Sequence, residues 1–211
     1  MFEKLRLWAE VILLFLAVPL VLAFFLPPSA LYPVLGAATI VGIILLHLTP
    51  GFTWRSLLGL VHWGQVAGFG VLVFAVASAL CAWLLPDRVW FLLRNENLVI
   101  IAMLTLLYPP ILVFPQELVF RPLFFERYGS LFRSEAQRHG VNALLFSLAH
   151  LMYWHWVVLL LTFVGSFVFS MAYRRVSFLQ AMALHSIAGI AVFASGLGWF
   201  FYSGGHVVQG G

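Results

Sequence analysis

Four ionisable side chains lie in stretches of the chain that are otherwise almost entirely hydrocarbon. Glu117 and Arg121 stand at positions i and i+4, so they share one face of a helix. His150 and His185 lie in two later apolar stretches. A charge at the centre of a bilayer costs about 2.5–3.5 kcal/mol on insertion scales, so such groups indicate a functional site. One carboxylate and two imidazoles can activate water, either as a general base or as metal ligands.

Each of these residues also has a purely structural explanation. Glu117 and Arg121 can form a neutralised pair that locks one helix against its neighbours. A lone histidine in a helix is more often a core residue whose hydrogen bonds are satisfied. Three polar sites in three apolar spans are nevertheless hard to explain by packing alone.

The composition indicates a membrane protein. Of the 211 residues 64% are hydrophobic and only 9% are charged, and the mean hydropathy is +1.06. The apolar runs are long enough for helices that cross a bilayer, and they lack the alternation of barrel strands. The sequence therefore predicts an all-α fold, a polytopic transmembrane helical bundle. The net charge of +4 does not indicate a nucleic-acid partner, because the basic residues are spread between the apolar runs.

Seven to eight spans are expected. The aromatic segment 199–202 either extends the last span or forms an incomplete eighth. The segment 51–65, which carries aromatic rings and a cation, is expected at the membrane interface. The first apolar run lacks a small-residue cleavage site and is interpreted as an uncleaved helix. The seven spans are placed near residues 8–26, 33–48, 66–85, 98–116, 141–154, 156–173 and 178–194.

These spans group into three regions. Residues 1–97 hold the N-terminal transmembrane helices and the interfacial segment, 98–194 form a helical core with the candidate site, and 195–211 form a Gly-rich tail. The fourth span is expected to be kinked at its prolines, because each proline removes a backbone donor and clashes with the preceding turn. A kink frees carbonyl groups, which suits a hydrated cavity. These prolines are Pro109, Pro110 and Pro115.

The basic residues predict an orientation with the N-terminus in the cytoplasm. Arg88 and Arg94 then fall outside, and the other basic residues of the loops fall on the cytoplasmic side, as the positive-inside rule expects. These are Lys4, Arg6, Arg55, Arg127, Arg133, Arg138, Arg174 and Arg175. The three between the fourth and fifth spans, Arg127, Arg133 and Arg138, are expected to face lipid headgroups. Small size and short loops are typical of a bacterial protein of the cytoplasmic membrane.

The order of these motifs resembles the CAAX protease and bacteriocin-processing family, also called the Abi family. Gln116-Glu117-x-x-x-Arg121, then Phe146-x-x-x-His150, then His185 resemble its E-E-x-x-x-R, F-x-x-x-H and H-x-x-x-N motifs. The resemblance covers roughly residues 98–194. It implies a glutamate-dependent intramembrane endopeptidase without a cofactor. The implied substrate is a membrane protein or a peptide with a lipid or a C-terminal signal.

The resemblance also implies a role for each residue. A glutamate and His150 would activate a water molecule, His185 would donate to the developing oxyanion, and Arg121 would orient the glutamate region. A mechanistic variant is metal-assisted hydrolysis, because two histidines and one glutamate can hold zinc with an open position.

The chain departs from the family pattern at two positions. Gln116 replaces the first glutamate, usually assigned as the base, and an amide can only position a water molecule. Gly189 replaces the asparagine, which removes an oxyanion donor worth about 2.7–4 kcal/mol in a measured case. We expect an active enzyme because Glu117, His150 and His185 remain. An inactive protein that binds a membrane partner is the alternative, and a proton-coupled transporter is a further one.

Overall fold

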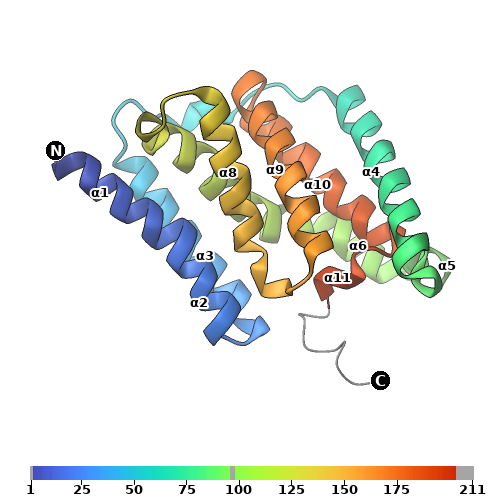
Figure 1. Cartoon of the computed structure of the whole chain (residues 1–211). Helices are drawn as coiled ribbons and strands as arrows, with labels where there is room; N and C mark the ends of the chain where they lie inside the picture. The colour runs from blue at the N-terminus through green and yellow to red at the C-terminus, as the bar shows by residue number, and fades with distance from the viewer. Residues whose placement is uncertain (1, 96–97, 203–211) are drawn as a thin grey trace.

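In the computed structural model the described residues, 2–95 and 98–202, form a bundle of helices without strands (Figure 1). The all-α fold is thereby confirmed. The last residues of the expected Gly-rich tail, 203–211, lie outside the described part. The α-helices are α1 (Phe2–Val11), α2 (Val18–Phe25), α3 (Leu31–His47), α4 (Trp63–Leu84), α5 (Phe91–Arg94), α6 (Leu98–Leu106), α7 (Phe114–Leu118), α8 (Glu135–Ala149), α9 (Trp156–Arg175), α10 (Phe178–Ser195) and α11 (Trp199–Tyr202).

Wider π-helical turns join several of these helices into longer rods. The turn Ile12–Ala17 connects α1 to α2, while Pro109–Val113 and Val119–Arg127 flank α7. The last two contain prolines and the first ends two residues before Pro19; a proline cannot donate the usual i→i−4 hydrogen bond. Short 3-10 turns lie in five other connections: Pro28–Ala30, Trp54–Leu57, Pro86–Arg88, Gly129–Leu131 and Leu151–Tyr153.

By length and composition, four described helices can cross a membrane, and a bent pair can form a fifth span. The four are Phe2–Phe25, Pro28–His47, Trp63–Leu84 and Trp156–Arg175. Two expected spans fall short of this length. The one near 141–154 is α8, which begins in a polar turn at Glu135 and has 15 residues, and the one near 178–194 is the shorter apolar helix Phe178–Ala194 within α10.

The fourth expected span does not end at residue 116. Val99–Leu106 and Pro109–Arg127 form a rod bent by 40°, so the kink expected at Pro109 and Pro110 is present. Glu117 and Arg121 therefore lie inside the second arm of the rod and are fully buried. Helical structure continues through Pro122 because the backbone there widens into the π-helical form.

The N-terminal rod packs on this second arm through aromatic rings and one ion pair. The ring of Phe15 meets those of Phe120 and Phe124 edge-on, at centroid distances of 5.2 and 5.7 Å. Nearby, Arg127 donates from Nε to Glu10 Oε2 at 2.7 Å and from Nη2 to Oε1 at 2.9 Å. The expectation that Arg127 faces lipid headgroups is wrong, because its side chain is buried against Glu10.

A close contact at a glycine fixes how α10 packs on α4; α10 lies between α4 and α9 (Figure 1). A Cβ added to Gly70 of α4 would lie 2.5 Å from Cγ1 of Ile187 on α10. After α10 the chain turns sharply at Gly196, whose φ of +95° favours glycine. The aromatic segment at Trp199–Tyr202 is therefore a separate short helix, α11, and does not extend α10.

Candidate active site

A bidentate ion pair lies at the centre of the candidate site. Arg121 donates from Nε to Glu117 Oε2 at 3.0 Å and from Nη2 to Oε1 at 3.2 Å. Both side chains are 0% exposed. The i, i+4 spacing on one continuous helix produces this contact, as the sequence predicted.

His185 connects this pair to the neighbouring helix α10. Its Nδ1 atom lies 2.9 Å from Oε1 of Glu117. A carboxylate can only accept hydrogen bonds, so Nδ1 carries a proton in this contact. Nε2 is then the ring nitrogen left to act on another group.

Two further polar residues, from α8 and α9, complete the network around the guanidinium. Arg121 donates from Nη1 to Oδ1 of Asn142 and, at 3.1 Å, to Oγ of Ser166. The amide of Asn142 in turn donates to the carbonyl of Phe120 at 2.7 Å. Neither residue was predicted from the sequence. Asn142 stands four positions before Phe146, and this helical spacing was the signal that could have revealed it.

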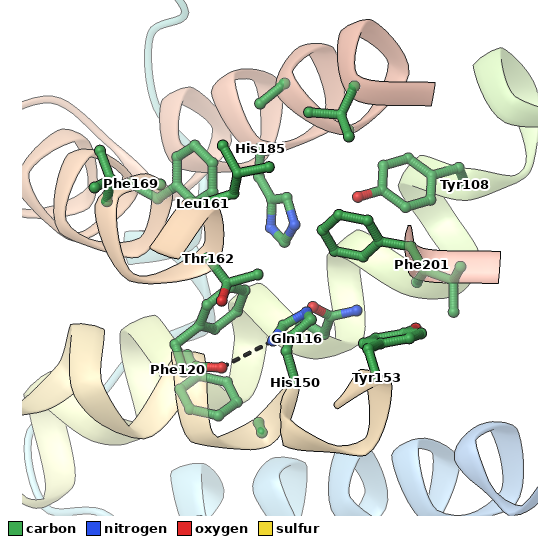
Figure 2. A pocket seen from close by; sticks show the side chains of 18 of the residues that line it. Tyr108, Gln116, Phe120, His150, Tyr153, Leu161, Thr162, Phe169, His185 and Phe201 are labelled. Carbon is green, nitrogen blue, oxygen red and sulfur yellow. Dashed lines mark hydrogen bonds between the residues drawn. The ribbon is translucent and has the colours of Figure 1, made fainter. Parts of the chain in front are cut away.

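A pocket of about 370 Å³ lies beside this network and is lined mostly by apolar side chains. Gln116, His150, His185 and Tyr108 contribute polar groups to its wall (Figure 2). Glu117 does not line it and lies behind His185. The fold thus brings together two of the predicted residues, His150 and His185, with the supporting residue Gln116, at one cavity.

Both imidazoles border the ring of Phe146. The centroid of this ring lies 4.7 Å from that of His150 and 5.6 Å from that of His185. The Nδ1 atom of His150 lies 2.8 Å from the carbonyl oxygen of Phe146, so this nitrogen also carries a proton (Figure 2). Each histidine therefore has its Nε2 atom free of the contacts that fix the ring.

Gln116 presents an unused acceptor at the same pocket. Its Oε1 atom is buried and has no hydrogen-bond partner among residues 2–95 and 98–202. Buried polar atoms without a partner are uncommon and call for an explanation. A water molecule or a substrate amide in the pocket would provide the missing partner.

The donor set at the pocket does not fit a zinc ion. Zinc sites in enzymes use three protein ligands, whereas the carboxylate of Glu117 is already held by Arg121 and His185. Within the described ranges, no group of three or more His, Cys, Asp and Glu side chains is arranged to hold a metal.

Comparison with known families decides the classification. Residues 95–191 match the family model described as type II CAAX prenyl endopeptidase Rce1-like. This region, just under half of the chain, belongs to the CAAX protease family. No curated protein and no solved structure matched the chain. The match runs from just before α6 into α10 and so includes all three predicted motifs.

Membership of a CAAX protease family, together with the long apolar helices, makes the chain an integral membrane protein. The two positions at which the chain departs from the family motifs, Gln116 and Gly189, lie in different surroundings. Gln116 faces the pocket, whereas Glu117 is enclosed by its partners. At Gly189 the phenol of Tyr108 occupies the space in which a side chain would start.

Proposed function

We propose that this CAAX protease family member is an active intramembrane endopeptidase that hydrolyses a peptide bond of a membrane-tethered protein. The observation that carries the proposal is the contact of His185 with Glu117 on one side and with the pocket on the other. A carboxylate behind an imidazole is the arrangement by which hydrolases prepare histidine to take a proton.

In the proposed reaction His185 is the general base. Nε2 takes a proton from a water molecule as its oxygen attacks the substrate carbonyl carbon, and Glu117 stabilises the resulting imidazolium through Nδ1. Arg121 holds the carboxylate of Glu117 in place. His185 then returns the proton to the leaving amine, and the peptide C–N bond breaks.

Gln116 holds the water molecule in this scheme, and His150 holds the substrate. One O–H group of the water faces Nε2 of His185 and the other donates to Oε1 of Gln116, while Nε2 of His150 accepts a hydrogen bond from the N–H of a substrate amide. The family resemblance implies that His185 donates to the oxyanion. In this scheme it is the general base instead, because its Nδ1 atom already donates a hydrogen bond to the carboxylate of Glu117. Glu117 likewise acts through His185 and does not contact water itself.

The substrate is proposed to be a membrane-tethered protein or a lipidated peptide. The family description names CAAX prenyl endopeptidases, and the apolar pocket suits a chain delivered from the bilayer. The N-terminus is proposed to lie in the cytoplasm, in a bacterial inner membrane, on the basic-residue pattern. No cofactor is proposed. Activity is expected to persist with a chelator, and a loss reversed by zinc would instead favour the metal-assisted variant.

The test is cleavage by the purified chain in proteoliposomes. A farnesylated peptide ending in CAAX and an unlipidated transmembrane peptide serve as probes, and mass spectrometry identifies the products. We expect wild type to cleave at least one probe, and His150→Ala to lose most of this activity. His62→Ala, which alters an exposed histidine, should cleave normally. Wild-type cleavage that is undiminished in both His150→Ala and Glu117→Gln would contradict the mechanism.

Binding without cleavage is the second candidate function. The presence of Gln116 and Gly189 at two motif positions favours it. It predicts that wild type retains a probe peptide without forming product, and that Glu117→Gln retains the peptide equally well.

A further inference from the structure

The phenol of Tyr108 fills the space beside Gly189 on α10. A Cβ added to Gly189 would lie 2.3 Å from Oη of Tyr108, 2.4 Å from Cε1 and 2.5 Å from Cζ. At these distances a side chain at position 189 fits only if the ring of Tyr108 moves. In the observed position the ring of Tyr108 therefore takes the space that a side chain at position 189 would need.

The bend of the fourth rod brings Tyr108 to this place. Tyr108 lies between the two arms, immediately before Pro109, where the rod bends by 40°. Its ring lies 6.3 Å from that of His185 and nearly perpendicular to it. Figure 2 shows the hydroxyl group of Tyr108 directed across the pocket toward His185.

The hydroxyl group of Tyr108 has no hydrogen-bond partner within the described part of the chain. A phenol O–H can donate one hydrogen bond, and the side chain of Tyr108 is half-buried at the pocket wall. Here the donor faces a largely apolar pocket that also contains the proposed general base. An oxygen atom of a bound substrate is an acceptor that would fit.

From this geometry we propose that Tyr108 is a catalytic residue that donates a hydrogen bond to the oxyanion of the tetrahedral intermediate. In the resembling family motif an asparagine four residues after the histidine would be this donor. Here that position is Gly189, and Tyr108 at the bend of the rod would donate the hydrogen bond instead. The proton stays on the tyrosine oxygen throughout, so Tyr108 takes no part in proton transfer. A donor fixed in a site of low polarity stabilises developing charge strongly. This inference rests on the proposed peptidase activity.

The first test is Tyr108→Phe, which removes the hydroxyl group and keeps the ring against Gly189. We expect kcat to fall by about 100-fold, the lower end of the loss for one oxyanion donor, with KM little changed. Tyr173→Phe is the matched control, because its hydroxyl group bonds Glu126 away from this pocket. A tyrosine that only packs would leave kcat unchanged in Tyr108→Phe.

The second test moves the hydrogen-bond donor from position 108 to position 189. Tyr108→Ala should be nearly inactive, and Gly189→Asn alone should be inactive because its side chain collides with Tyr108. The double variant Tyr108→Ala/Gly189→Asn has room for the amide on the same face of α10 as His185. We expect it to be at least about tenfold more active than Tyr108→Ala, a coupling typical of residues in contact.

Two results would overturn this assignment while leaving the peptidase proposal intact. One is a Tyr108→Phe enzyme as active as wild type, and the other is a double variant no more active than Tyr108→Ala. A wild-type chain that cleaves no probe would overturn both proposals together.

Discussion

The Nδ1 atom of His185 lies 2.9 Å from Oε1 of Glu117, although 68 positions separate the two residues in the sequence. This contact connects a fully buried ion pair to a residue of the pocket wall. It explains how a carboxylate that does not line the pocket can still support chemistry inside it.

Removing the charges of both Glu117 and Arg121 should abolish cleavage but cost little stability. In Glu117→Leu the guanidinium of Arg121 loses its counter-ion, which costs roughly 3–5 kcal/mol for a buried pair. In Glu117→Leu/Arg121→Met no charge remains, so most of this loss should be recovered. The double variant should nevertheless lack cleavage activity. Thermal unfolding in detergent and the peptide assay measure the two properties, and an active double variant would show that the pair is only structural.

Restoring the family glutamate at position 116 tests which group is the base. In our scheme Gln116 only holds water, so Gln116→Glu should not raise kcat. A carboxylate at the apolar wall would also lack the partners that stabilise Glu117. Steady-state kinetics measures the effect. A large gain in kcat would mean that the chain uses a weakened form of the family mechanism, and that His185 is not the main base.

The ion pair between Glu10 and Arg127 should stabilise the attachment of the N-terminal rod. Glu10→Ala leaves a buried guanidinium unpaired and should reduce the free energy of unfolding by roughly 3 kcal/mol. Arg6→Ala is the control, because Arg6 is largely exposed and 3.7 Å from the same glutamate. Its effect should stay within about 1 kcal/mol. Equal losses in the two variants would contradict this account.

Two glycines of α4, Gly70 and Gly68, test the packing of α4 against α10. Gly70→Ala brings a methyl group against Ile187 and should destabilise the bundle by about 1–3 kcal/mol. Nothing lies within 4 Å of a Cβ at Gly68, so Gly68→Ala should be neutral or stabilising by at most about 1 kcal/mol. Unfolding in detergent compares them. If Gly68→Ala is destabilised while Gly70→Ala unfolds like wild type, the contact between α4 and α10 is not at Gly70.

The fold class and the motif residues could be predicted from the sequence because they depend on local patterns. Apolar length indicated the helices, the i, i+4 spacing indicated the contact of Glu117 with Arg121, and the prolines indicated the bend. The lengths of the later helices were less predictable. Apolar runs in the interior of a bundle resemble short spans, and α8 begins with polar residues, of which Glu135 and Gln137 are exposed.

The remaining features depend on contacts between distant segments. Nothing near Arg127 in the sequence indicates that Glu10 is its partner. Asn142 and Ser166 are ordinary polar residues until the guanidinium of Arg121 is placed between them. The sequence does not indicate that Gly189 makes room for the ring of Tyr108, because the two residues meet only through the bend of the rod.

Chemical rescue of His185→Ala tests the central claim most directly. The purified variant in proteoliposomes should form product at least about 1,000-fold more slowly than wild type, as expected when a general base is removed from a hydrolase of this kind. Added imidazole should restore part of the rate, because the truncated side chain leaves space beside Glu117. A His185→Ala variant that cleaves at the wild-type rate without imidazole would contradict the claim that His185 activates the water.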